Sequence, residues 1–350
     1  MIGPRVAIVV LNWNRGQDTV ECIESIFRSS YDNYDVILLD NGSTDDSVHM
    51  IREFCKGKIK VNSWLFESGP EPDEIHLLEY TLQEATTGGD PSLEKAYSSH
   101  RASRRLKLIA CDRNYGFAEG NNIAIRYALE SAGPDYVVIL NNDAVVDREC
   151  ISELVSGVQS DMAVGFASPK VLFYSLDGRR DVLQFAGGRL LRRRGLTMSI
   201  GKEELDRGQF DIMQRTDYAA GSCMLVTREM IDRVGLLDPR FFAYWEEVDW
   251  CVRGSVAGYK SSYVPKARIW HKRSSSSTTS FQTYYMSRNR LLFMKKNTSP
   301  IDYMAFVLYL FYLDCWLETV RMLMRHGAQI ALFKSFARGL FDGLQIQKRM

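Results

Sequence analysis

Charge of one sign, paired cysteines and long apolar runs are all scarce in this sequence. The chain carries 44 Lys and Arg residues against 43 Asp and Glu residues, and the resulting net charge of +1 argues against a general nucleic-acid-binding protein. Its seven cysteines are scattered, odd in number and without a Cys-x-x-Cys pair, so no disulfide framework is predicted. This cysteine usage is typical of a reducing environment and predicts a cytoplasmic protein.

The scarcity of long apolar runs limits the ways in which the chain could meet a membrane. The amino-terminal residues lead directly into a strand pattern that Asn12 interrupts, so no signal peptide is expected. The apolar segment Tyr303–Leu317 is interrupted by Asp314 and is too short to span a bilayer comfortably. With its basic flanks it fits an amphipathic helix on an anionic surface, peripheral to the inner face of the cell membrane. A buried core helix fits the same pattern equally well.

The glycine-rich fingerprint of dinucleotide-binding proteins is also absent, which disfavours a redox enzyme. The sequence instead alternates strand and helix patterns as far as residue 145. Short apolar runs predict four strands, at Val6–Leu11, Asp35–Leu39, Leu106–Ala110 and Tyr136–Leu140, with helical patterns between them. This alternation predicts an α/β fold whose mostly parallel central sheet has helices on both faces.

Two later regions depart from this alternation. Residues 62–105 are polar and rich in turn formers, and we expect a peripheral insertion in which Asp73–Ala85 forms a helix. Beyond residue 145 the pattern is irregular, with predicted strands at Ser261–Val264 and Arg268–Trp270 and mostly helix after Phe281. We therefore expect one domain over residues 1–300, with halves of about 1–145 and 146–300, and a helical segment over 301–350.

Polar residues follow each predicted strand of the first half. Because the carboxyl ends of parallel strands meet at one edge of the sheet, these residues are expected to lie close together where ligands bind. A glycine-bearing turn before a helix also offers backbone donors to anionic groups, so the edge predicts a nucleotide pocket. Taken singly, each cluster is equally explained by ordinary turn chemistry, and only the combination favours a site. The clusters comprise Asn12 and Asn14; Asp40; Asn114, Gly116, Gly120 and Asn121; and Asn141, Asn142 and Asp143.

The second half contributes an acidic cluster and a histidine. Glu246, Glu247 and Asp249 stand among tryptophans, and an aromatic setting raises the proton affinity of a carboxylate, as a general base requires. Acids are also favoured in the first turn of any helix, and that structural alternative stays open. His271 directly follows a predicted strand, which favours it over the other histidines as a ligand, although a lone histidine is commonly a packing residue.

Nearly the whole chain apart from residues 62–105 resembles a known family, the inverting GT-A glycosyltransferases of family 2, and in particular their rhamnosyltransferase-like branch. The resemblance rests on motifs that occur in the family's order: Val9–Asn14, Leu39–Asp45, Asn114–Asn122, Leu140–Asp143, Ala220–Val226, Gly235–Phe242, Glu246–Arg253, Tyr285–Arg290 and Gly339–Gly343. It implies the GT-A fold, with a donor-binding first half and an acceptor-binding, catalytic second half.

The resemblance also implies roles for the residues of the predicted site. Asp40 would recognise the base or ribose of a nucleotide-sugar donor, and Asn141–Asp143 is similar to the family's DXD motif. Asp143 and His271 would be ligands of a divalent cation, Mn²⁺ or Mg²⁺. Glu247 stands where the family has an aspartate base, and Glu246 or Asp249 could share this role. The loop Ser274–Ser280 would close over the donor diphosphate.

The function implied is an inverting, metal-dependent transfer of a sugar, with rhamnose as the leading guess, in cell-surface polysaccharide synthesis. The donor would be linked to dTDP or UDP, and the acceptor would be a glycan or a lipid-linked sugar. Two alternatives remain at this stage. One is a sugar-1-phosphate nucleotidyltransferase, although the first loop, Leu11–Gly16, has only one glycine and one arginine where this class would need a glycine-rich, basic loop. The other is a non-catalytic scaffold or glycan-binding protein of the same fold, which the glutamate at position 247 would favour.

Overall fold

The computed structural model describes residues 3–66, 74–272, 279–326 and 329–346. In this part of the chain an 11-stranded mixed sheet has the main order β11-β13-β7-β12-β5-β1-β2-β4-β3, with β6 beside β13 and β8 beside β7. A separate hairpin pairs β9 with β10. The strands are β1 (Val6–Asn12), β2 (Tyr34–Asp40), β3 (His76–Thr81), β4 (Arg105–Ala110), β5 (Tyr136–Asn141), β6 (Ala144–Val146), β7 (Val164–Phe173), β8 (Leu183–Phe185), β9 (Gly188–Leu191), β10 (Leu196–Ser199), β11 (Gln214–Thr216), β12 (Cys223–Thr227) and β13 (Lys260–His271).

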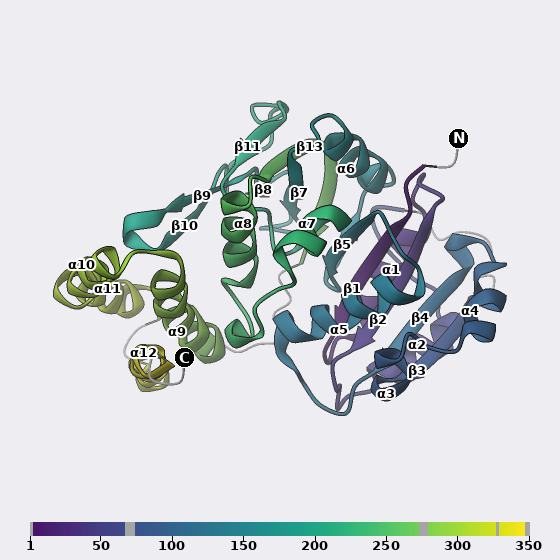
Figure 1. Ribbon diagram of the computed structural model, residues 1–350, viewed down its shortest axis with the longest axis horizontal. Coiled ribbons are helices and arrows are strands. Elements are labelled where there is room, and N and C mark those ends of the chain that lie inside the picture. Colours follow the sequence, from purple (N-terminus) through teal and green to yellow (C-terminus); the bar gives the residue numbers. More distant parts are fainter. Residues whose placement is uncertain (1–2, 67–73, 273–278, 327–328, 347–350) are drawn as a thin grey trace.

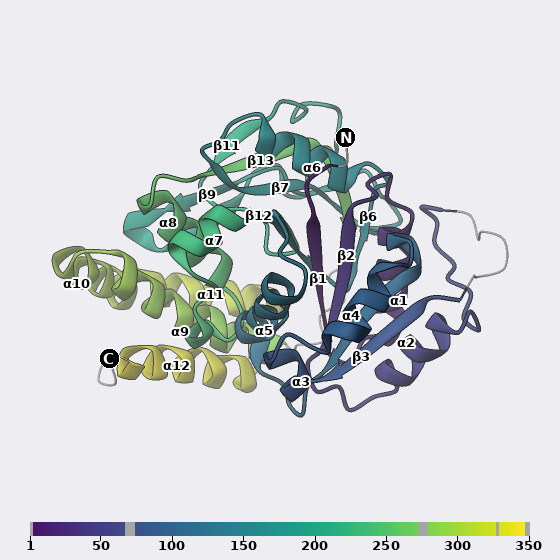
Figure 2. The same ribbon diagram turned by 45° about the vertical axis from the view of Figure 1, so that its right-hand side comes forward.

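Helices pack around this sheet, as Figures 1 and 2 show. In the first half α1 packs against α2, and α5 packs on β1 and β2; in the second half α6 packs on β7 and β13. The α-helices are α1 (Gly16–Phe27), α2 (Ser47–Cys55), α3 (Leu82–Thr86), α4 (Pro91–Ser98), α5 (Gly116–Ser131), α6 (Cys150–Gln159), α7 (Arg228–Val234), α8 (Glu246–Val256), α9 (Thr279–Asn297), α10 (Pro300–Tyr309), α11 (Cys315–His326) and α12 (Ile330–Gln345). Short turns of other helix types are η1 (Ala102–Arg104), η2 (Arg192–Arg194), η3 (Pro239–Phe241) and the π-helical η4 (Leu310–Asp314).

The first half of the sheet is parallel, as predicted. Strands β5, β1, β2, β4 and β3 pair in the same direction, and the register sets Asn12 beside Asp40 and Leu11 beside Asn141. The polar residues at the strand ends are therefore neighbours at one edge. This fixes the floor of the site through backbone pairing alone.

The antiparallel strand β12 joins the two halves. It pairs with β5 on one side and with β7 on the other, while β13 runs parallel to β7. After β5 the strand is interrupted at residues 142–143, and the chain continues as β6. This strand pairs with the end of β13, so that Ala144 lies opposite His271. The break in the strand thus brings Asp143 next to His271.

The insertion contradicts part of the prediction. Residues 76–81 form the edge strand β3 rather than a helix over 73–85, and residue 73 lies outside the described residues. Burial alternates along β3, with Leu78 and Tyr80 buried and Glu79 and Thr81 exposed, which is the period of a strand. The helix begins only at Leu82, where Thr81 and Glu84 form a capping box. The insertion therefore extends the central sheet.

A second difference concerns the two strands predicted at Ser261–Val264 and Arg268–Trp270, near the end of the second half. They form one continuous strand, β13, in which the pairing with β7 shifts register between Val264 and Arg268. Residues 265–267, between the two predicted strands, mark this irregularity and do not form a loop. One long strand therefore carries His271 to the same edge as Asp143.

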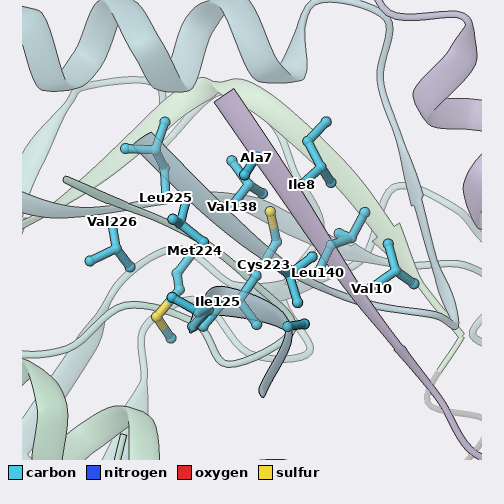
Figure 3. Close-up of a cluster of buried hydrophobic side chains, with 14 of the residues drawn as sticks. Ala7, Ile8, Val10, Ile125, Val138, Leu140, Cys223, Met224, Leu225 and Val226 are labelled. Carbon is cyan, nitrogen blue, oxygen red and sulfur yellow. The ribbon is translucent and has the colours of Figure 1, made fainter. Parts of the chain in front are cut away.

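The core between the two halves is apolar. Figure 3 shows side chains of β1, β5 and β12 meeting Ile125 of α5, and these residues are at most 1% exposed. Close packing on this scale resists displacement of the strands. The ends of β1 and β5, with Asn12 and Asn141, therefore stand on a rigid base.

The carboxyl-terminal segment is helical, as predicted, but its apolar helix is longer than expected. α10, η4 and α11 run on without interruption, and Pro300–Met324 is a 25-residue helix long and apolar enough to cross a membrane by length and composition. Only 17% of its apolar window is buried, so the alternative of a buried core helix does not describe it. Figure 1 shows α10 and α11 on the side of the molecule away from β3.

Candidate functional site

A saturated network of amide and hydroxyl groups holds the carboxyl edge of the parallel strands together. The Asn12 Nδ2 donates to Asp40 Oδ1 at 2.7 Å and to Ser43 Oγ at 3.1 Å. Its Oδ1 accepts from Thr19 Oγ1 at 2.7 Å and from Asn142 Nδ2 at 3.1 Å. An asparagine side chain offers two donors and two acceptor sites, so Asn12 has no capacity left for a ligand. Asn12 and Asn142 are thus positioning residues that join β1, β2 and β5.

The loop after β2 encloses the carboxylate of Asp40. Asp40 Oδ1 accepts from Ser43 Oγ at 2.6 Å and Oδ2 accepts from the Ser43 backbone N–H at 3.0 Å. Asn14, in the left-handed region with φ 55°, accepts from the Thr44 N–H at 2.7 Å through its Oδ1. Asn14 therefore joins the loop after β1 to the loop that presents Asp40.

The start of α5 is engaged within the protein and leaves no free donors for an anion. Asn114 Oδ1 accepts from the Gly116 N–H at 2.7 Å, and the N–H groups of Phe117 and Ala118 donate to the Phe242 carbonyl at 2.6 and 3.1 Å. Gly116 has φ +81°, and a Cβ there would stand 2.5 Å from the Phe242 ring. These N–H groups, expected from the sequence to bind an anion, instead join the start of α5 to the loop before α8.

The other members of this cluster pack α5 onto the sheet. A Cβ at Gly120 would stand 2.8 Å from Leu11 Cδ1, so the glycine permits a close approach of helix and strand. Asn121 is fully buried and donates to the Phe117 carbonyl, while its Oδ1 has no partner. Gly120 thus sets the distance between α5 and β1, and Asn121 makes its hydrogen bond within α5.

Asp143 and His271 come together where β5 and β13 end. His271 Nε2 lies 3.0 Å from Asp143 Oδ1 and 3.4 Å from Asn141 Nδ2. On the other side of the ring, Nδ1 is 2.8 Å from Gln184 Oε1, and this contact fixes the orientation of the ring with Nε2 facing Asp143.

This pair suits a divalent cation as part of its coordination shell. The buried Asn141 Oδ1 has no hydrogen-bond partner, and an oxygen of this kind beside a carboxylate and an imidazole fits a metal of the Mn²⁺ type. Within the described residues no group of three or more His, Cys, Asp or Glu side chains could hold a metal ion. Asp143 and His271 would therefore need further ligands from a bound molecule.

A strained turn precedes the acidic cluster. Phe242, Tyr244 and Trp245 have positive φ values of 64°, 69° and 76°, which non-glycine residues seldom adopt. The side-chain Nδ2 of Asn289 in α9 lies 2.7, 2.7 and 2.8 Å from three carbonyl oxygens of this turn, those of Phe241, Ala243 and Tyr244, which share its two N–H donors. Strained backbone persists only where its surroundings fix it, and clusters at functional sites.

Glu246 and Glu247 follow directly at the start of α8. Burial raises the pKa of Glu246 well above its ordinary value, with a further contribution from the Glu247 charge, and burial also raises the pKa of Glu247. Each side chain has one buried carboxylate oxygen without a partner. Glu247 is only half-buried, and a Cβ placed on Gly221 would be 3.4 Å from its Cδ. This is the environment of a carboxylate that is ready to accept a proton.

Asp249 has a different environment. Its side chain is fully buried, and Oδ2 pairs with Arg253 and with Lys296, each at 2.8 Å, while Oδ1 accepts from Asn297 at 2.9 Å. These three partners occupy both oxygens of the carboxylate. Asp249 therefore anchors α9 to α8 and is not available as a proton acceptor.

Among the residues of the site to which the sequence assigned no role are Gln184, Gly221 and Asn289, although the last two lie within the motifs Ala220–Val226 and Tyr285–Arg290. Gln184 lies 87 residues before the ring that it orients, and Asn289 lies 45 to 48 residues after the carbonyls that it binds. No local pattern signals contacts of this range. The predicted loop Ser274–Ser280 falls mostly outside the described residues, which resume at Thr279.

Comparison of the fold with solved structures identifies the class. A mannosyltransferase from Pyrobaculum calidifontis, solved with GDP-mannose and Mn²⁺, matches with a TM-score of 0.52 at 15% identity, over 99% of this chain and 85% of that one. A likeness at this identity shows the fold alone. The fold is that of the GT-A glycosyltransferases, as predicted.

Family models then identify the family. The description "Glycosyltransferase like family 2" matches residues 98–291, and "Glycosyl transferase family 2" matches residues 7–64. The chain belongs to glycosyltransferase family 2, which confirms the resemblance inferred from its motifs.

Curated relatives point to the rhamnosyltransferase-like branch. A dTDP-rhamnosyl transferase of Shigella flexneri is 25% identical over 56% of this chain and 66% of its own length. An N-acetylglucosaminyl-diphospho-decaprenol L-rhamnosyltransferase of Mycobacterium tuberculosis is 26% identical over 49% of this chain and 60% of its own length. The matches thus span about three fifths of these relatives.

Proposed function

We propose that this protein is an inverting glycosyltransferase that moves a rhamnose-like sugar from a nucleotide donor to a glycan or lipid-linked acceptor. The observation that carries the proposal is the convergence of Asp143 and His271, 3.0 Å apart, at the strand ends that also present Asp40. The name of the Shigella flexneri relative supports a dTDP-linked donor, and a UDP-linked donor is the other base to be tested.

In the proposed reaction Glu247 is the general base. Its carboxylate takes the proton from an acceptor hydroxyl as that oxygen forms a bond to the anomeric carbon of the donor. The bond from that carbon to the diphosphate breaks on the opposite face, so the nucleoside diphosphate leaves and the anomeric configuration inverts. Gly221 lies beside this carboxylate, since a Cβ on residue 221 would stand 3.4 Å from the Glu247 Cδ, an ordinary van der Waals distance.

Asp143 and His271 would hold the divalent cation, with Asn141 Oδ1 beside them. When bound, Mn²⁺ or Mg²⁺ would neutralise the charge that develops on the departing diphosphate. Gln184 keeps the His271 ring in the orientation that this role requires. Asp40, fixed by Asn12 and Ser43, would bind the ribose or base of the donor.

We also propose that the protein acts in the cytoplasm, docked peripherally on the inner face of the cell membrane through the helix Pro300–Met324. Large apolar side chains are exposed along it, with Tyr312 80%, Trp316 71% and Met324 75% exposed. The one acid in its centre, Asp314, is buried and paired with Arg290, so it does not interrupt the exposed apolar surface. An exposed apolar surface of this extent favours a bilayer interface.

Flotation with phosphatidylglycerol vesicles tests the docking. We expect the full chain to float with the vesicles and the double variant Tyr312→Glu/Trp316→Glu to bind about tenfold more weakly, because charge is costly at an apolar interface. Met162→Glu is the matched control, since Met162 is 84% exposed outside this helix. Equal flotation of all three proteins would contradict the proposed contact.

A panel of nucleotide sugars tests the activity. We expect release of a nucleoside diphosphate in the presence of Mn²⁺ or Mg²⁺ and its loss after chelation, with dTDP-rhamnose the leading donor. Formation of a nucleotide sugar from a sugar-1-phosphate and a nucleoside triphosphate would instead identify the nucleotidyltransferase alternative. Donor binding without turnover of any nucleotide sugar would favour the non-catalytic alternative.

A further inference from the structure

A second pocket lies outside the proposed donor site. It has a volume of about 300 Å³ and is formed by β9, β11, the end of α8 and the start of β13. Three arginines line it: Arg189 from β9, Arg192 from the hairpin turn η2, and Arg215 from β11. Figure 1 shows the β9–β10 hairpin between β11 and the helices α10 and α11.

The positive charge of this pocket is only partly compensated by the residues that the structure describes. In the part of the chain that the structure describes, none of the three guanidinium groups has a hydrogen-bond or ion-pair partner. The arginines at the centre of the second half are paired, as in Arg253 with Asp249 and Arg290 with Asp314. Unpaired guanidinium groups that converge on a pocket suit a phosphate, whose oxygens they bind in pairs.

Asp217, which also lines the pocket, offsets one of the three positive charges and leaves an excess of two. Asp217 Oδ2 accepts from the Leu190 backbone N–H at 2.8 Å, so this carboxylate is bound to the hairpin. The neighbouring Thr216 Oγ1 likewise bonds to the backbone of Gly188. Both contacts tie β9 to the end of β11 and the residue that follows it, and thereby hold Arg189 and Arg215 around one space.

Two segments of the chain run from the pocket lining to the proposed catalytic base, Glu247. Residues 216–217 lead through the buried Tyr218 to Gly221, which lies against Glu247. Burial and the Glu247 charge raise the pKa of Tyr218 to about 12, which reflects this proximity. Along α8, the eight residues from Glu247 to Ser255, which lines the pocket, correspond to an axial rise of about 12 Å.

The pocket also borders the exposed apolar helix. The turn η2 contacts α10, with the Arg194 guanidinium 5.7 Å from the centre of the Tyr309 ring, and Arg290 donates to the Arg194 carbonyl. The cationic site thus lies between the end of α8, whose first turn carries Glu247, and the helix α10 with its exposed apolar side chains. A molecule with a sugar, a phosphate and a hydrocarbon chain in series has this order of chemistry.

We propose that Arg189, Arg192 and Arg215 bind the phosphate groups of a lipid-linked acceptor, while its sugar reaches Glu247 and its hydrocarbon chain lies along α10. This inference rests on the proposed function, since it assigns the acceptor side of that same reaction. It is separate from the Asp143–His271 pair and therefore from the donor diphosphate.

Binding of inorganic pyrophosphate to the full chain tests the site directly. Titration calorimetry in EDTA with saturating dTDP keeps the probe away from the donor and metal residues. We expect Arg189→Gln and Arg215→Gln each to weaken binding about tenfold or more, as the loss of a charge-assisted hydrogen bond does. Arg148→Gln is the matched control, because Arg148 is exposed and lies outside the pocket. Equal affinity in all four proteins, or no binding to the wild type, would overturn the proposal.

A turnover measurement separates the two phosphate sources. If the arginines serve the acceptor, the KM for the nucleotide sugar stays unchanged in Arg189→Gln and Arg215→Gln during donor hydrolysis. A rise of tenfold in that KM would assign the arginines to the donor and overturn the proposal. If the wild type consumes no nucleotide sugar at all, the proposed function fails and the inference that rests on it is overturned with it. Wild-type turnover with unaltered pyrophosphate binding in the variants would overturn the inference alone.

Discussion

The edge of the sheet that carries Asn12 and Asp40 and the turn that precedes α8 are built in opposite ways. At the edge, Asn12 satisfies all four of its hydrogen-bonding positions with Asp40, Ser43, Thr19 and Asn142. In the turn, residues 242–245 include three strained non-glycine residues, and the two glutamates that follow each keep a buried oxygen without a partner. In the first region Asn12 finds all its hydrogen-bond partners among the strand ends and the residues that follow them, whereas the turn is held by contacts from α9 and α5.

Under the proposed function, this difference predicts that the edge with Asp40 governs donor binding and that the turn before α8 governs the rate of sugar transfer. A saturated network is rigid and presents Asp40 in one orientation, as selective donor binding requires. A strained turn with unpartnered carboxylates is costly, and it persists because Asn289 and the start of α5 hold its carbonyls. Changes at the turn should therefore lower kcat more than they weaken donor binding.

The largest expected effect is that of Asp143→Ala. Loss of the metal carboxylate removes several kcal/mol of charge stabilisation, which corresponds to a rate loss of about 10³-fold or more. The measurement is nucleoside diphosphate release at saturating Mn²⁺. Asp232→Ala, which removes an exposed acid from α7, is the control and should keep wild-type activity. Activity of Asp143→Ala within tenfold of the wild type would remove this residue from the metal site.

Asn289→Leu tests the support of the turn. The substitution removes two N–H donors that three carbonyls of the turn share, and each buried carbonyl left unpaired costs about 1–3 kcal/mol. We expect kcat to fall about 10- to 100-fold and Tm to drop, with an unchanged KM for the donor. Asn33→Leu removes a single exposed hydrogen bond and serves as the control. A rise in donor KM without a change in kcat would contradict this division of roles.

Gly116→Ala tests the junction between the two regions. The new Cβ would stand 2.5 Å from the Phe242 ring, on a backbone with φ +81°. We expect a loss of about 2–4 kcal/mol in the free energy of unfolding, from overpacking and from strain together. Gly178→Ala is a matched control, with φ +77° and no atom within 4 Å of the new Cβ, and should lose only about 1 kcal/mol. Equal losses in both variants would show that the Phe242 contact contributes nothing.

The smallest effect is that of Glu246→Gln on stability. Burial raises the pKa of Glu246 in the folded protein above its unfolded value, so its stabilising contribution is complete at low pH. That contribution is lost as the pH rises through the folded pKa. A glutamine is neutral throughout, so the Tm of the variant should gain a few degrees on the wild type between pH 5 and pH 8. The exposed Glu203→Gln should show no such gain, and neither should Glu246→Gln if its carboxylate were solvated.

The parallel half of the fold was predictable because its signals are local. Apolar runs mark β1, β2, β4 and β5, and parallel pairing then sets Asn12 beside Asp40 without further information. The strand β3 was not predicted, because residues 75, 78 and 82 have the spacing of a helix while pairing with β4 imposes the period of a strand.

The site was predictable only in part, for the same reason. Asp143 and His271 follow strands and could be proposed from that placement alone. Their neighbours Gln184 and Asn289 act across 87 and 48 residues, and Asp249 became a structural residue through its contacts with Lys296 and Asn297. Such contacts depend on tertiary packing that no local pattern specifies.

The most direct test of the central claim is a single-turnover measurement on Glu247→Gln with saturating donor and acceptor. Glutamine keeps the shape of the side chain but cannot accept the proton, so a loss of about 10²–10⁴-fold in rate is expected with unchanged donor affinity. Because burial raises the pKa of Glu247, the wild-type rate should increase as the pH rises through that pKa, and the residual rate of the variant should not. A variant with the full wild-type rate and pH profile would contradict the assignment of Glu247 as the base.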